Sequence, residues 1–404
     1  MSTPMYPSNK IKPEMAKPVH VTTAEDFYFA LMPSYWLSKI IGVLHLSFEG
    51  QPPNRKLIVS KNFIYLAAVR ILIVFAVVAF FHTSLIYEGL PDEMTTVVLD
   101  IDVYCGIIVT IIELISAMLS RKSDLRTIEQ FIELDKRLSS AGIKIDYIKA
   151  RRVAIIEIAL VLAQNIFKTI MLVITAPYRI ILINSGLNIM SMLNSFQLNE
   201  YINMVLMLKQ RFNWLNKAIL DNYERKWRRD DCKKSEVKKN IQTYGKLYND
   251  LRKLSKRVDS TFGFFVLVLI ISRFIMLNTL LIYLYTTIKN PNIRNGTEYA
   301  SIAINTGFHA YKLIMITCIP ASATNKAKET GKCLHQMWDL DQDIRDEIAY
   351  FSMQVIQQTP NYTANGFLRL DYPLVTTILG TITTYLIIVI QFDINFNAPP
   401  TTCP

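Results

Sequence analysis

The polar side chains best placed to do chemistry lie on one apolar segment near the C-terminus, residues 373–392. At helical spacing, five of its side chains fall on a single stripe: Thr377, Thr381, Thr384, Ile388 and Gln391. A threonine hydroxyl can bond back to its own helix, but a glutamine amide is poorly placed against lipid. The stripe therefore predicts either a surface that faces water, or a packing face between helices that is rich in small residues.

Patterns typical of catalysis or metal binding are absent from the sequence. It has no glycine-rich dinucleotide loop, no phosphate-binding loop, no His-Glu-x-x-His and no Cys-x-x-Cys. Its five histidines share no spacing that would let them bind one metal ion. We therefore expect a protein that is not an enzyme and that needs no cofactor or metal.

Composition indicates a membrane protein. Of 404 residues, 51% are hydrophobic and 19% are charged, whereas soluble domains have about 25% charged residues. Runs of about 20 apolar residues, the length that crosses a bilayer, predict seven transmembrane helices, at 62–81, 95–119, 153–176, 180–208, 258–288, 299–320 and 373–392. With 13 glycines, 16 prolines and 5 cysteines, the chain is neither collagen-like nor a small disulfide scaffold.

Lysine and arginine positions predict the orientation. Of 44 such residues, 37 lie before the first expected span or in alternate connections (120–152, 209–257 and 321–372). The other side holds Arg179, Lys289 and Arg294. Because basic loops stay in the cytosol, we expect the N-terminus inside and the C-terminus outside. The net charge of +11 then reflects topology and gives no indication of nucleic-acid binding.

This orientation divides the chain into five parts. Residues 1–61 form a cytosolic segment, 62–320 six spans with cytosolic extensions, 321–372 a cytosolic helix, 373–392 the last span and 393–404 an extracellular tail. In the first part, the stretch 27–48 is interrupted by Pro33 and Gly42, so we expect a short helix, either at the inner membrane interface or packed in the cytosol. G-protein-coupled receptors place the N-terminus outside and are excluded, and an odd span count without inverted repeats fits a secondary transporter poorly.

A motif on the last span resembles the signature of the insect gustatory receptor family. It reads Thr384-Tyr385, five apolar residues, then Gln391-Phe392. Shorter likenesses occur at residues 31–42 and 211–216. The resemblance implies an all-α membrane protein with seven transmembrane helices and a tetrameric ion channel with a central pore. It would be a ligand-gated, non-selective cation channel in the plasma membrane of sensory neurons, either a homotetramer or a heteromer with related receptors.

The resemblance also implies roles for the stripe. The last helix would line the pore, with Gln391 and Phe392 as the gate near its outer mouth, above Ile388, Thr384 and Thr381. Phe392 would block ions by dewetting the constriction. Asp393 would add a ring of negative charge that favours permeant cations, unless it is simply a solvated loop acid.

A cytosolic helix over 334–358 would anchor the tetramer, in the pattern that the family implies. Its apolar residues recur at helical spacing: Met337, Ile344, Ile348, Phe351 and Val355. The same pattern would suit an amphipathic helix packed within one subunit. Pro360 and Gly366 then separate this helix from the last span.

A small-molecule tastant, whether sugar, polyol or bitter compound, would bind in an outward-facing pocket lined by the outer halves of helices two to six. The candidate residues are Tyr104, Asn165, Lys168, Asn184, Asn188, Tyr283, Tyr285, Phe308 and His309. Each could equally make a structural hydrogen bond between helices. Ligand identity, glycosylation at Asn295 and the alternatives of an odorant-type receptor subunit or a transporter stay open. Membrane lipid is the remaining expected partner.

Overall fold

The long apolar segments are helical, because only a helix satisfies all backbone polar groups of a segment surrounded by lipid. The computed structural model describes residues 23–40, 46–51, 55–60, 65, 67–69, 71–72, 75–76, 93–175, 178–224, 233–289 and 296–396. Within these, the elements are α1 (Ala24–Ile40), β1 (Leu46–Glu49), β2 (Lys56–Val59), α3 (Glu93–Ser140), α4 (Tyr147–Thr175), α5 (Tyr178–Asn222), α6 (Lys234–Lys289), α7 (Gly296–His335), α8 (Gln342–Gln357), β3 (Thr363–Ala364), β4 (Leu368–Arg369) and α9 (Tyr372–Phe396).

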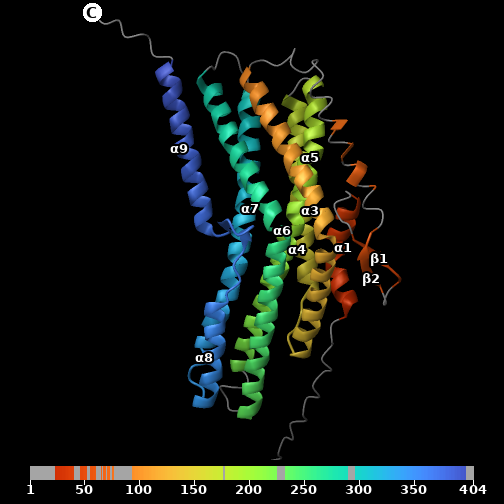
Figure 1. Cartoon of the computed structure of the whole chain (residues 1–404), viewed down its shortest axis with the longest axis vertical. Helices are drawn as coiled ribbons and strands as arrows, with labels where there is room; N and C mark the ends of the chain where they lie inside the picture. Colours follow the sequence, from red (N-terminus) through yellow and green to blue (C-terminus); the bar gives the residue numbers. More distant parts are fainter. Residues whose placement is uncertain are drawn as a thin grey trace, which may run out of the picture.

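Four helices have at least 40 residues each, about twice the length that a bilayer requires. α3, α5, α6 and α7 have 48, 45, 56 and 40 residues, whereas about 20 span the hydrocarbon core. They run along the long axis of the molecule, with α9 in its upper half and α8 at its lower end (Figure 1). α3 packs on α6, α5 on α7, and α1 on α4. The two hairpins, β1–β2 and β3–β4, are antiparallel.

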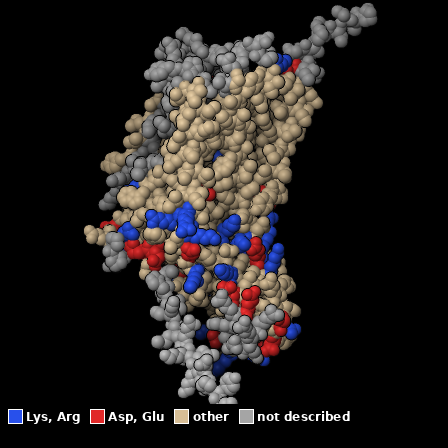
Figure 2. Space-filling view, turned by 180° about the vertical axis from the view of Figure 1, so that it is seen from behind, with Lys and Arg blue, Asp and Glu red and all other residues tan. Residues whose placement is uncertain are grey.

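Charged side chains gather in the lower half of the molecule. In Figure 2, the described surface of the upper half is almost free of Lys, Arg, Asp and Glu, which cluster below it. Large apolar side chains of α4, such as Ile156, Leu160 and Ile166, are exposed, which is more apolar surface than soluble monomers usually expose. The upper half therefore has the surface of a membrane domain.

Five described helices are long and apolar enough to cross a membrane: α3, α4, α6, α7 and α9. They coincide with five of the seven expected spans. The expected span 62–81 lies largely outside the described residues, as do the side chains of 181–190 in α5. The count of seven therefore stays a prediction.

Helix boundaries differ from the sequence expectations in several places. α3 runs on to Ser140, through the first part of the connection expected at 120–152. α7 continues past Pro320 to His335, so residue 320 is not a helix end; a membrane helix tolerates proline where neighbouring groups satisfy the freed carbonyl. The helix expected over 334–358 is broken by a turn, and α8 begins at Gln342 after Asp341, whose ψ of 155° is not helical. α1 likewise continues through Pro33.

A buried ion pair organises the charged half. Arg211 of α5 donates to both carboxylate oxygens of Asp135 on α3, at 2.8 and 2.6 Å. The Tyr147 hydroxyl at the start of α4 donates to the same carboxylate at 2.9 Å. The guanidinium also lies against three aromatic rings: Phe27 of α1, Phe131 of α3 and Trp214 of α5. Four helices thus meet at one charge pair.

The β3–β4 hairpin connects α8 to the last span and is held by α6. Asp259 accepts hydrogen bonds from the Thr363 backbone N–H at 2.6 Å and from its hydroxyl at 3.0 Å. One turn along α6, a Cβ on Gly263 would lie 3.0 Å from the Asn365 backbone nitrogen, so glycine lets the hairpin backbone approach the helix. The position of α9 therefore depends on α6.

Replacing Asp259 with alanine is expected to weaken this attachment. Two hydrogen bonds to a carboxylate are lost, which costs roughly 1.5–3 kcal/mol, so the purified variant should melt at a lower temperature than the parent. The matched control is Asp346→Ala, which removes an exposed carboxylate from α8 and should leave the melting temperature unchanged. Equal melting temperatures for both variants would show that Asp259 does not hold the hairpin.

Candidate functional site

The last helix, α9, is attached to the rest of the chain along one edge. Among its described side chains only Ile378 and Ile382 are buried, on the side that meets α6 and α7. The five residues of the predicted stripe (Thr377, Thr381, Thr384, Ile388 and Gln391) are all exposed. Within one chain, the stripe is therefore not a packing face.

The threonines of α9 bond back to their own helix. The hydroxyls of Thr377, Thr381 and Thr384 donate to the carbonyls of Pro373, Thr377 and Gly380 at 2.9–3.0 Å. Their donors are satisfied locally, while each hydroxyl oxygen keeps acceptor capacity. A column of such oxygens suits water or cations better than anions.

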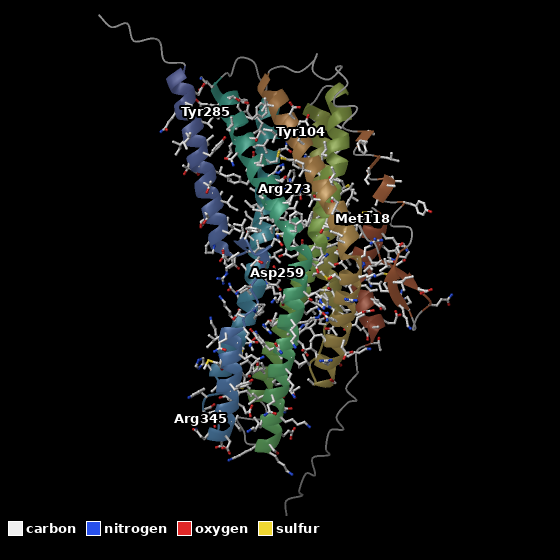
Figure 3. All side chains as sticks on the ribbon, in the orientation of Figure 1. Tyr104, Met118, Asp259, Arg273, Tyr285 and Arg345 are labelled. Carbon is white, nitrogen blue, oxygen red and sulfur yellow. The ribbon has the colours of Figure 1, made fainter. Side chains whose placement is uncertain are left out.

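At the upper end of α9, the predicted gate residues sit beside a polar contact with α6. Gln391 and Phe392 are exposed, Phe392 by 60%. The next residue, Asp393, accepts a hydrogen bond from the Tyr285 hydroxyl at 2.9 Å and forms an ion pair with Lys289. Tyr285, labelled near the top of α6 in Figure 3 and one of the candidates for the ligand pocket, contacts the last helix through this hydrogen bond.

Two of the predicted ligand-binding residues, Lys168 and His309, belong to a group of basic side chains inside the bundle. Arg273 of α6 lies 2.9 Å from the His309 ring nitrogen Nδ1, and Lys168 and Lys312 are both close enough to His309 to act on it electrostatically. Beside them, Phe308 of α7 meets Phe167 of α4 edge to face, with 6.3 Å between ring centroids. This group, the basic cluster, consists of Lys168, Arg273, His309 and Lys312.

The other predicted ligand-binding residues are spread over the bundle. Tyr104 on α3 is half exposed. The Asn165 amide donates to the Val161 carbonyl at 2.7 Å. The Tyr283 carbonyl accepts hydrogen bonds from the hydroxyls of Thr286 and Thr287. The side chains of Asn184 and Asn188 lie outside the described part of the chain.

Arg273 and Lys312 were missing from the predicted site. Both are buried in apolar helices, and Figure 3 shows Arg273 between the levels of Asp259 and Tyr285. A basic residue inside an apolar span is costly unless it faces partners or water. That signal was present in the sequence, but it did not indicate which residues would meet.

Helix α8 packs within its own chain. Met337 and the apolar residues of α8, including Ile348 and Phe351, are buried, and the Phe351 ring meets that of Tyr248 on α6 at 5.8 Å. The apolar face that was expected to anchor a tetramer is therefore occupied within the chain, because α6 and α7 extend far enough to cover it. The opposite face keeps Tyr350, Met353 and Ile356 exposed.

Sequences similar to this chain occur among chemosensory receptors. A family model described as 7tm Chemosensory receptor matches residues 31–396. Gustatory receptor 59f of Drosophila melanogaster is 23% identical over 222 residues, 55% of this chain and 53% of that protein. Gustatory receptor for bitter taste 66a of the same species is 20% identical over 166 residues, 40% of this chain and 32% of that protein. The chain thus spans about half the length of the first relative and a third of the second.

The fold is similar to that of a solved structure. The insect olfactory receptor OR5 from Machilis hrabei superposes with a TM-score of 0.62, covering 90% of this chain and 99% of that one, at 10% sequence identity. At such low identity the likeness concerns the fold alone.

Proposed function

Because the chain belongs to the 7tm chemosensory receptor family, we propose that it is a gustatory receptor that acts as a ligand-gated, non-selective cation channel. A small non-volatile tastant opens it. The working unit is a tetramer, of this chain alone or with related receptors, in the plasma membrane of sensory neurons. The N-terminus lies inside and the seventh helix, α9, lines the central pore.

The exposed stripe on α9 is the observation that carries this proposal. An apolar helix that exposes a glutamine amide and a column of threonines is unfavourable against lipid. Four copies arranged around an axis would place the stripes against water, with Phe392 as an apolar constriction and Gln391 beside it. A pore explains why one edge of α9 packs on α6 and α7 while the polar edge has no cover within the chain.

The exposed face of α8 supports assembly in the cytosol. Tyr350, Met353 and Ile356 lie on the side turned away from α6 and α7. Exposed aromatic and methionine side chains are enriched at protein interfaces. This face, rather than the buried one, is the contact between subunits.

The polar contact at the top of α9 transmits ligand binding to the gate. Lys289→Gln removes the ion pair that joins α6 to Asp393. Exposed pairs are worth up to about 1 kcal/mol, so the tastant concentration for half-maximal current should shift by about two- to fivefold. The control is Lys149→Gln, which removes the same charge from an exposed position on α4. It should cause no shift in the tastant concentration for half-maximal current. An identical response in both variants would exclude Lys289 from gating.

Recording current from cells that express the chain tests the function. We expect cation current on application of at least one sugar, polyol or bitter compound, and we expect it to persist in excised patches without nucleotides. Current that persists in excised patches distinguishes a channel from a metabotropic receptor. Unitary steps in the current distinguish a channel from a transporter. Absence of evoked current both alone and with a related receptor subunit would overturn the channel proposal.

An odorant-type receptor subunit is the second candidate. The observation that favours it is the fold likeness to OR5, which has been solved in complex with eugenol. The same recordings with volatile compounds distinguish the two. Currents evoked only by volatile compounds would favour the odorant-type function. For both candidate functions, we propose that the ligand contacts the basic cluster and Phe308.

A further inference from the structure

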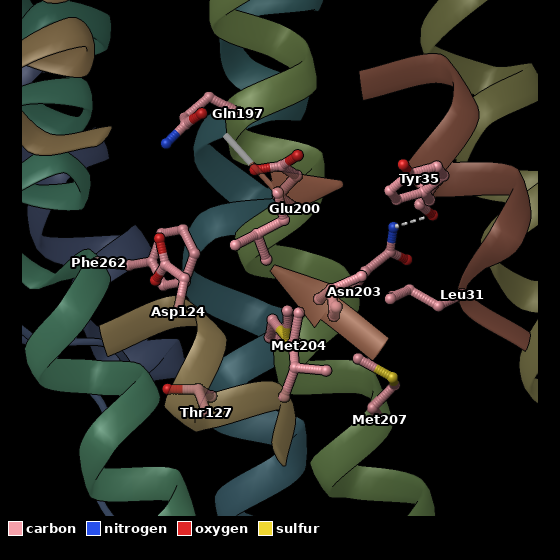
Figure 4. Close-up of a pocket in the computed structure, with 14 residues that line it drawn as sticks. Leu31, Tyr35, Asp124, Thr127, Gln197, Glu200, Asn203, Met204, Met207 and Phe262 are labelled. Carbon is pink, nitrogen blue, oxygen red and sulfur yellow. Dashed lines mark hydrogen bonds between the residues drawn. The ribbon is translucent and has the colours of Figure 1, made fainter. Parts of the chain in front are cut away.

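A cavity lies between α1, α3, α5, α6 and the β1–β2 hairpin, and has a volume of about 60 Å³ (Figure 4). The residues that line it, all in the described part of the chain, include none from the stripe on α9 or from the basic cluster. One water needs about 10–15 Å³ of such volume, and benzene fills a cavity of about 150 Å³. The space therefore suits several waters or an organic molecule smaller than benzene.

Most of the cavity wall is apolar and adaptable. Apolar side chains from all four helices line it, among them Leu31, Ile128, Met204, Met207 and Phe262. Methionine side chains adjust to ligands of different shapes. An apolar wall with a few polar groups is the usual make-up of a small-molecule site, so this wall suits the carbon chain of a small ligand.

The side-chain amide of Gln197 on α5 is the polar group in the wall that lacks a partner for its acceptor. Gln197 is only 6% exposed, and its Oε1 atom has no hydrogen-bond partner among the described residues. A buried acceptor without a donor is unfavourable, so the cavity favours an occupant that donates a hydrogen bond. The amide also carries N–H donors, and a hydroxyl group, which both donates and accepts, matches it.

Other polar side chains of the wall already have interactions. Asp124 accepts a hydrogen bond from the Ser120 hydroxyl at 2.7 Å, and Glu200 also makes an interaction. The Asn203 amide donates to the Ser34 hydroxyl at 3.2 Å (Figure 4). The two acids therefore do not require a bound cation, and a charged ligand would lose its hydration against a mostly apolar wall. These contacts favour a neutral ligand.

The unpartnered amide and the methionines lie at opposite ends of the cavity. In Figure 4, Gln197 lies at the upper end, and Met204 and Met207 lie toward the lower end. We propose that the cavity binds a small neutral alcohol, a hydroxyl group on an apolar body of about three or four carbons. The hydroxyl donates to Gln197 Oε1, and the carbon chain packs against Met204 and Phe262.

A smaller neighbouring cavity gives the carbon chain room to be longer. It has a volume of about 20 Å³ between α1, α4 and α5, and shares Leu31, Ser34, Asn203 and Met207 with the first. A longer alcohol would extend past Met207 in this direction. Because neither cavity is lined by a residue of the α9 stripe or the basic cluster, binding here can be tested independently of channel activity.

Binding is measured on the purified full-length protein by titration with saturation-transfer NMR, with protein-free detergent as the blank. The probes are 1-butanol and its isomer diethyl ether, which has the same atoms but no hydrogen-bond donor. We expect 1-butanol to bind at least about fivefold more tightly than the ether, because only the alcohol supplies a donor to Gln197. A third probe, n-butylammonium chloride, tests the effect of charge and should bind more weakly than 1-butanol.

Gln197→Met keeps the approximate size of the side chain and removes its acceptor. The variant should fold like the parent, since it removes a buried acceptor without a partner, and it should bind 1-butanol and diethyl ether equally. The matched control is Gln130→Met, which changes an exposed glutamine on α3 outside the cavity. This control should keep the preference of the parent for the alcohol.

The comparison of 1-butanol with diethyl ether on the parent needs no variant, so it is decisive even if Gln197→Met does not fold. Equal affinity for the two isomers, or a preference for the alcohol that persists in Gln197→Met, would overturn the proposal. Absence of saturation transfer to either isomer would show a cavity that holds only water. Tighter binding of n-butylammonium than of 1-butanol would show a cation site instead.

Discussion

Replacing Arg211 with methionine is expected to destabilise the protein by about 3–5 kcal/mol, because it leaves the Asp135 carboxylate buried without its counter-charge. Both residues are about 1% exposed, so water cannot replace the lost partner. The substitution also removes the guanidinium from three aromatic rings and loosens the junction of α1, α3, α4 and α5. We expect little folded protein at the cell surface, measured by surface labelling and size-exclusion chromatography.

An exposed arginine on the same side of the molecule provides the control. Arg137 pairs with Glu133 and Asp250, but its side chain is 56% exposed, and such pairs contribute about 0–1 kcal/mol. Arg137→Met should therefore express like the parent. The double variant Arg211→Met with Asp135→Leu should recover part of the loss, since an apolar pair can replace a buried ion pair. Normal expression of Arg211→Met would show that the buried pair is dispensable.

Replacing Phe392 with alanine is expected to raise the basal current about tenfold. If four Phe392 rings form an apolar constriction, removing them lets water and cations pass without ligand. A tenfold change corresponds to about 1.4 kcal/mol in the balance of closed and open states. The measurement is whole-cell current without tastant, normalised to surface protein. Because Phe392 is 60% exposed in the single chain, the substitution removes little packing within the subunit.

Phe367→Ala is the matched control, since Phe367 is also an exposed phenylalanine but lies in the β3–β4 turn, far along the chain from the gate. Its basal current should equal that of the parent. Unchanged basal and evoked currents in Phe392→Ala would contradict the gate assignment while leaving the rest of the channel proposal intact. A rise in both variants would indicate a general loosening of α9 instead.

Helix identity and the segregation of charge could be predicted from the sequence because both are local. Apolar runs of bilayer length and basic residues between them need no partner to be recognised, and five of the expected spans coincide with described helices. The stripe on the last helix is equally local, since its residues are fixed to one face by helical geometry. The helix ends were less predictable. α3 and α7 continue beyond their apolar parts because packing in the charged half supports them.

The pairings depended on contacts between residues far apart in the chain. Arg211 meets Asp135 across 76 positions and Tyr285 meets Asp393 across 108, and no periodicity within either helix indicates those partners. The apolar face of α8 could be recognised, but not whether its own subunit or a neighbour covers it.

The sequence alone therefore determined the family, the apolar spans, the polar stripe and the side on which the charge lies, because each follows from residues on a single segment. Only the tertiary structure decided that Arg273 lies against His309 and that Asp393 is tied to α6. Those results depend on how separate helices pack, and packing is set by the shapes and charges of several segments together.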